Sequence, residues 1–144
     1  MTKNEKVLYY SLFALNELID EYLKESINVK VRELSMVRTY SRKAMSQMQV
    51  PTQVDIKILK TIENRTKELY ELANLKDKDK KQIWLSETDR KYMININVLS
   101  ALVIDCLENM KSIDKKLKTS LKYLRTYSNK FFEMVEETAP LEEG

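Results

Sequence analysis

Histidine is absent from this chain of 144 residues, and glycine and cysteine each occur once, as Gly144 and Cys106. Without histidine, a Ser-His-Asp triad and a His/Cys zinc site are excluded. With glycine only at position 144, the interior lacks the loops that cradle phosphates and the usual residue for tight β-hairpin turns. One cysteine cannot form a disulfide within the chain. We therefore expect function to lie in surfaces, in a protein that is not an enzyme and holds no cofactor or metal.

The composition is typical of a globular protein, with 43% hydrophobic residues, 33% charged residues and a net charge of +3. The most apolar stretch, 96–104, is much shorter than the roughly 20 residues that a membrane-spanning helix needs. The first residues show no signal-peptide core. These features predict a soluble, cytoplasmic protein with no membrane contact.

Hydrophobic residues at helical spacing predict the first two helices. A capping box of Thr2 and Glu5 opens a helix over about 3–25. Its apolar face is Leu8, Leu12, Leu15, Ile19 and Tyr22. We place a break near 26–28 and a second helix through Met48, although alternating apolar residues in 27–31 also permit a short strand. The face predicted for the second helix is Val31, Leu34, Val37, Tyr40, Ala44, Met45 and Met48.

Pro51 ends the second helix, because the residue before a proline is pushed out of the α region. Thr52 and Asp55 open a third helix to about Leu75, followed by a charged connector over 76–81. The buried face predicted for the third helix is Leu59, Ile62, Thr66, Leu69 and Leu72 or Ala73.

Ser86 is the predicted N-cap of a fourth helix that is apolar almost all round and therefore central to the fold. Near Ser112 this helix bends, or stops and restarts, and a last helical segment continues to about Glu137. Together, these segments predict an all-α fold, an elongated bundle of four to five amphipathic helices. We expect one helical domain over 1–138 and a frayed acidic tail over 139–144.

A basic stripe marks the last predicted helix. Its members, spaced four and three apart on one helical face, are Lys111, Lys115, Lys118, Lys122 and Arg125. Such a stripe suits a phosphate backbone or an acidic partner, and it is also typical of a solvated outer face. A second basic cluster in residues 30–43 is compatible with a solvated surface, a protein interface or a nucleic-acid contact; its members are Lys30, Arg32, Arg38, Arg42 and Lys43. The residues that we assign to a protein interface are Arg32, Arg38, Arg42, Trp84, Phe131 and Phe132.

Two motifs carry a resemblance to a known family. Residues 67–76, KELYELANLK, end the third predicted helix, and residues 85–92, LSETDRKY, open the fourth. Over about 52–110 the chain resembles the helical domain of archaeal GINS subunits, in which an E-L-Y-like helix is followed by L-[ST]-x-E-E-x-x-[FY]. Members usually carry a small β-domain, for which this chain has neither room nor turn glycines. The resemblance therefore implies a subunit made of the helical domain only.

The resemblance implies a scaffold without catalysis, packed against sister subunits in a tetramer that bridges the MCM ring and a RecJ-like partner in DNA replication, near the nucleoid. From the residues we likewise expect an interaction subunit in a homo- or hetero-oligomer. Its interface would reach about 2,000 Å² in an obligate assembly. The alternatives are a nucleic-acid-binding protein that uses the basic stripe and a structural bundle from a virus or mobile element. No small-molecule substrate is expected.

Overall fold

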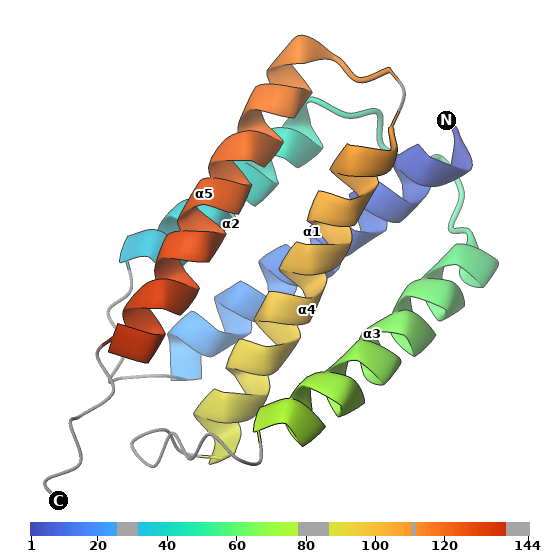
Figure 1. Cartoon of the computed structure of the whole chain (residues 1–144). Helices are drawn as coiled ribbons and strands as arrows, with labels where there is room; N and C mark the ends of the chain where they lie inside the picture. The colour runs from blue at the N-terminus through green and yellow to red at the C-terminus, as the bar shows by residue number, and fades with distance from the viewer. Residues whose placement is uncertain (26–31, 78–86, 111, 138–144) are drawn as a thin grey trace, which may run out of the picture.

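The computed structural model contains five α-helices, and it describes residues 1–25, 32–77, 87–110 and 112–137 (Figure 1). The helices are α1 (Lys3–Glu25), α2 (Arg32–Ser46), α3 (Ile56–Asp77), α4 (Glu87–Asn109) and α5 (Lys115–Glu137). Within these four ranges there is no strand. The all-α bundle is therefore confirmed. The possible strand at 27–31, the cap at Ser86 and the acidic tail at 139–144 lie outside the described residues.

The helices form three layers (Figure 1). α2 packs against α5 on one side, α1 and α4 form the middle layer, and α3 lies on the other side. α1 contacts α2 and α4 contacts α5, so these four helices close a ring around one core. Within the described residues, α3 contacts only α1 and α4. The position of α4 in the middle layer agrees with its nearly all-round apolar character.

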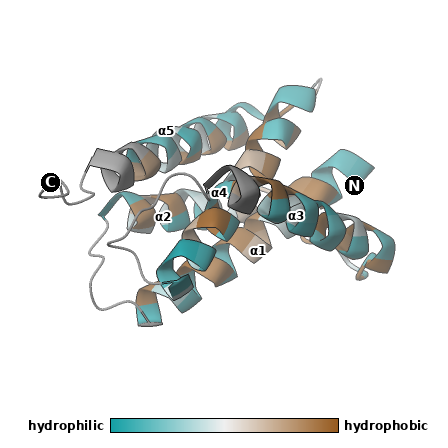
Figure 2. Ribbon diagram, turned by 60° about the horizontal axis from the view of Figure 1, so that its bottom comes forward, coloured by the Kyte–Doolittle hydropathy of each residue, from teal (hydrophilic) through white to brown (hydrophobic). Residues whose placement is uncertain are grey.

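The main core lies inside this ring of four helices. Its deepest side chains are Leu8, Leu12, Leu15, Ile19, Leu34, Val37, Ile96, Val103, Leu121, Leu124 and Phe131. Hydrophobic segments of the helices face inward, while the outer sides of α3 and α5 are mostly hydrophilic (Figure 2). The apolar face predicted for α1 is the face that is buried, because burial of such a stripe is what stabilises an amphipathic helix.

Side-chain caps fix three of the helix starts. In the capping box predicted for α1, the Glu5 amide donates to Thr2 Oγ1 at 3.2 Å and the Thr2 amide donates to Glu5 Oε1 at 3.4 Å. α3 begins after Asp55, whose Oδ1 accepts the Ile58 amide at 3.2 Å, and not at Thr52. α4 ends at Asn109 and α5 starts anew after Asp114, whose Oδ2 accepts the Lys116 amide at 3.0 Å. The chain therefore stops and restarts near Ser112.

Two predicted details are wrong. α2 ends at Ser46, two residues before Met48. On α3, Leu59 is 37% exposed and Leu72 is 56% exposed, whereas Ile58 and Ile62 are buried and Ala73 is half-buried. Because α3 rests on the α1/α4 pair alone, only a narrow strip of its surface is covered. Leu59 and Leu72 fall on the two flanks of that strip.

Candidate functional site

Two arginines of the second basic cluster, Arg38 and Arg42, form ion pairs with Asp20 of the same chain. Arg38 Nη1 lies 3.1 Å from Asp20 Oδ1, and Arg42 Nη2 lies 2.9 Å from Asp20 Oδ2. Arg42 Nε also donates to Asn16 Oδ1 at 3.1 Å. Burial raises the pKa of Asp20, but the Arg38 hydrogen bond and the charge of Arg42 outweigh it, so the pKa is lowered. These contacts tie α2 to α1, which gives Arg38 and Arg42 a role inside the fold.

The other residues assigned to an interface fall in different places. Phe131 is 0% exposed in the main core, and Phe132 packs against that core with its ring 5.0 Å from the Phe131 ring. Phe131 therefore belongs to the fold and is not an exposed anchor. Arg32 is exposed at the start of α2, and Trp84 lies outside the described residues.

A large apolar groove opens between α3 and the α1/α4 pair. Its volume is about 930 Å³. The apolar and aromatic side chains that line it are Tyr10, Ala14, Leu59, Ile62, Tyr70 and Leu99. The charged side chains on it are Glu63, Lys67 and Lys91. We call this feature the α3 groove. It exists because α3 lies against two helices only and leaves its Leu59 flank uncovered.

Exposed apolar side chains continue from the α3 groove toward the start of α3. Val50 is 63% exposed and Val54 is 70% exposed in the connection from α2, and Ile56 is exposed in the first turn of α3. Tyr10 holds this connection against α1, because its hydroxyl donates to the Gln53 carbonyl at 3.4 Å and accepts the Asp55 amide at 3.1 Å. The sequence interpretation missed these residues. Their signal was weak, because single valines beside Pro51 show no helical spacing.

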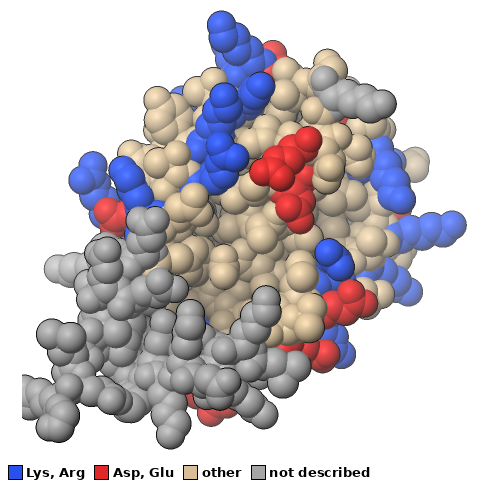
Figure 3. All heavy atoms as spheres, viewed as in Figure 1, with Lys and Arg blue, Asp and Glu red and all other residues tan. Residues whose placement is uncertain are grey.

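The basic stripe lies on the outside of α5. Lys115, Lys118 and Lys122 are exposed and Arg125 is half-buried, while Lys111 lies outside the described residues. Lysine and arginine side chains gather in a column over the upper half of α5, with an acidic group beside it toward α4 (Figure 3). The four described residues of the stripe therefore share one face of α5, as their spacing of three and four predicts.

A second groove, which the sequence interpretation missed, lies between α2 and α5 beside this stripe. Its volume is about 750 Å³. Three lysines line it, Lys43 from α2 and Lys115 and Lys116 from the start of α5. Ser120 donates to Gln47 Oε1 at 2.8 Å, a bond that joins α5 to the residue following α2. We call this feature the lysine–tyrosine groove. It joins one residue of each basic cluster, because α2 and α5 pack side by side.

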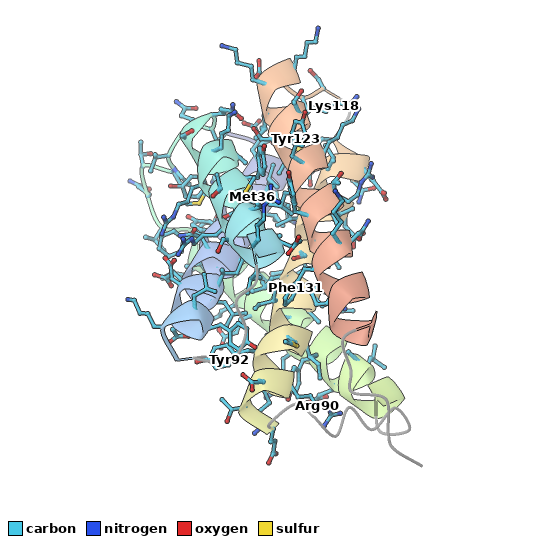
Figure 4. All side chains as sticks on the ribbon, turned by 90° about the vertical axis from the view of Figure 1, so that its left-hand side faces the viewer. Met36, Arg90, Tyr92, Lys118, Tyr123 and Phe131 are labelled. Atoms are coloured by element: carbon cyan, nitrogen blue, oxygen red, sulfur yellow. The ribbon has the colours of Figure 1, made fainter. Side chains whose placement is uncertain are left out.

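Tyrosines form one wall of the lysine–tyrosine groove. The Tyr40 ring of α2 stacks on Tyr123 at 5.0 Å and on Tyr127 at 5.7 Å, with interplanar angles of 16° and 11°. Lys43 Nζ lies 6.0 Å from the Tyr40 ring centroid, at the outer limit of a cation–π contact. Tyr123 is still 48% exposed. In Figure 4, Tyr123 and Lys118 lie toward the same end of α5.

Within the described residues, no cluster of three or more acids or cysteines is arranged to hold a metal ion, and no helix is long and apolar enough to cross a membrane. Burial raises the pKa of the Cys106 thiol to about 11, and the charge of Asp105 adds to the shift. A thiol with such a pKa stays protonated at neutral pH and is a poor nucleophile.

Comparison with protein-family models, with curated proteins and with solved structures finds no match to this chain. The two grooves are therefore the features from which a function can be inferred.

Proposed function

We propose that this protein is a non-catalytic scaffold subunit that binds the amphipathic helix of a protein partner in the α3 groove. The observation that supports the proposal is the groove itself, an open cleft of about 930 Å³ with apolar walls on three helices. Exposed apolar surface of this kind marks interaction sites on soluble proteins.

The shape of the α3 groove favours a helix as the occupant. Its residues on α3 run from Leu59 to Tyr70 at spacings of three and one, which is one helical face. The eleven steps from Leu59 to Tyr70, at a rise of 1.5 Å each, give a length of about 17 Å, or roughly three turns. A helix of that length inserts apolar anchors three or four residues apart into such a groove. Glu63, Lys67 and Lys91 supply charged groups of both signs for the polar edges of the partner.

The apolar residues beside the groove enlarge the apolar surface that a partner can bury. Val54 and Ile56 lie a few residues before Leu59, and all three are exposed. A partner that covers the groove and this adjoining edge buries an apolar centre with a charged rim, the usual anatomy of a protein interface.

Leu59 and Leu72 provide a matched test. Both are exposed leucines on α3, but only Leu59 lines the α3 groove. A photo-crosslinking amino acid at position 59 is expected to capture one discrete partner in extracts of the native host, and the same group at position 72 is not. Leu59→Asp should abolish the complex, measured by co-purification, and Leu72→Asp should leave it intact. Equal capture at both positions, or a chain that stays monomeric and captures nothing, contradicts the proposal.

The resemblance to archaeal GINS subunits supplies the most specific form of this proposal. In that form the partner helices belong to sister subunits, and the assembly contacts the replicative helicase at the nucleoid in the cytoplasm. Co-purified sister subunits and an MCM-type ring, lost on Leu59→Asp, are the expected result. A partner unrelated to replication would refute the GINS form and leave the scaffold function in place.

A further inference from the structure

We propose that the lysine–tyrosine groove binds single-stranded nucleic acid without sequence preference, with phosphates on its lysines and a base stacked on Tyr123. This inference concerns a surface separate from the α3 groove and does not rest on the scaffold proposal.

The charge of the groove favours a polyanion. Lys43, Lys115 and Lys116 converge on it from two helices, and none of the described residues that line it is acidic. The nearest acid in sequence, Asp114, accepts amide hydrogens at the start of α5. Exposed Lys118 and Lys122 extend the positive surface along α5. Lysines arranged in this way neutralise phosphates and release counterions from a nucleic acid strand.

The tyrosines favour a nucleic acid over other polyanions as the ligand of the groove. Tyr40 packs on Tyr123 at 5.0 Å and orients that ring, which remains 48% exposed. Stacking of bases on such platforms is favourable whatever the base, because every base has a π-face. An acidic peptide would use the lysines but would gain little from the ring.

The same geometry favours a single strand over a duplex. Bases in a duplex are stacked on one another, and only unpaired bases are free to stack on a side chain. Among the described residues, the lining contains lysine but no arginine, and arginine is the residue that most often reads guanine through bidentate contacts. We therefore expect binding that is independent of sequence.

The direct test is fluorescence anisotropy at 50 mM salt. The labelled ligands are 20-nucleotide single strands of DNA and RNA and a duplex of the same length. We expect both single strands to bind the full chain more tightly than the duplex. For three phosphates neutralised on a single strand, the slope of log affinity against log salt is about −2. Affinity should then fall roughly 20-fold between 50 and 200 mM salt.

Four variants locate the site. Lys116→Glu should weaken binding roughly tenfold or more, whereas Lys60→Glu makes the same charge change on an exposed position of α3 and should have a much smaller effect. Tyr123→Ala should weaken binding roughly tenfold through loss of stacking, and Tyr123→Phe should preserve it. Circular dichroism checks that each variant folds. If Tyr123→Ala unfolds the chain, Tyr123→Trp provides the second measurement, since a stacked base should quench the new indole.

Several outcomes would overturn the inference. Absence of binding to single strands at 50 mM salt is one, and equal affinity for the duplex is another. Equal loss with Lys60→Glu and Lys116→Glu would show attraction to net charge alone. Binding to polyglutamate or to anionic phosphatidylserine vesicles, with no binding to single strands, would assign the groove to an acidic protein or a membrane surface.

Discussion

At the scale of single residues, Asp20 is the polar side chain that joins two helices most directly. It accepts hydrogen bonds from Arg38 and from Arg42, both on α2. Two partly exposed ion pairs around one carboxylate contribute about 1 kcal/mol together. Asp20→Asn should therefore lower the free energy of unfolding by about 1 kcal/mol at pH 7, measured by urea denaturation. Glu21→Gln, which removes an exposed carboxylate next to it, is the control and should cost less.

The pH dependence of this stability loss tests whether the ion pairs of Asp20 cause it. The pKa of Asp20 in the folded chain is lower than its ordinary value of 3.8. The carboxylate thus stabilises the fold fully above about pH 5, and the contribution disappears as pH falls through the lowered pKa. The difference in unfolding free energy between wild type and Asp20→Asn should be constant from pH 5 to 7 and should shrink below pH 4. A difference at pH 2 as large as the difference at pH 7 would assign the loss to packing.

Cys106 allows a chemical test of burial on α4. With its pKa raised to about 11, almost none of the thiol is ionised at pH 8. Since the thiolate is the reactive form, native protein should react with a disulfide reagent roughly tenfold or more slowly than protein unfolded in guanidinium. The rate is read from the absorbance of the released thiol. Equal rates in the two states would show that Cys106 is open to solvent in the native fold.

At the scale of the helices, α3 is the element with the weakest attachment. In the described part of the chain, its contacts with α1 and α4 are sparser than those that α2 and α5 make with their neighbours, and Ile58 and Ile62 lie outside the main core. Segments with few buried contacts open locally at a lower free energy than the core does. Native-state hydrogen exchange should therefore be faster in α3 than in α1 or α4. Ile62→Ala should cost about 2 kcal/mol, and Leu12→Ala, at the centre of the core, about 4 kcal/mol.

The contrast between α1 and α3 shows which structural features the sequence predicts and why it does not predict the others. For α1, a capping box fixes the start and one wide apolar stripe fixes the buried face, because any partner must cover the same stripe. For α3, the pairs Ile58/Leu59 and Leu72/Ala73 are adjacent in the chain, so their side chains point about 100° apart on the helix. Which member is buried depends on the direction from which α1 and α4 approach.

The candidate surfaces differ in the same way. The stripe on α5 was predictable, because its residues lie within one helix at regular spacing. The lysine–tyrosine groove was not, because it needs Lys43 and Tyr40 of α2 beside Lys116 and Tyr123 of α5. No local pattern specifies that these two helices pair. The α3 groove likewise depends on what α3 leaves uncovered, and this is a property of packing.

At the scale of the whole molecule, the two grooves lie on different layers. The α3 groove is built by α1, α3 and α4, and the lysine–tyrosine groove by α2, α5 and the residue following α2. They have no residue in common, and within the described chain α3 contacts neither α2 nor α5. The two proposed ligands, a protein partner and a nucleic acid strand, would therefore occupy separate surfaces and could be bound at the same time.

Because the two grooves are separate, we expect the effects of substitutions in them on the free energy of unfolding to be additive. Substitutions far apart with no shared partner change the free energy of unfolding additively, within about 0.5 kcal/mol. The double variant Leu59→Ala/Tyr123→Ala should therefore lose the sum of the two single losses in urea denaturation. The same independence should hold for binding, so Leu59→Asp should leave the affinity for single strands unchanged and Lys116→Glu should leave partner capture unchanged. A coupling free energy above about 1 kcal/mol would mean that the core transmits strain between the layers. Occupancy of one groove would then regulate the other, and the two surfaces would have to be treated as one site.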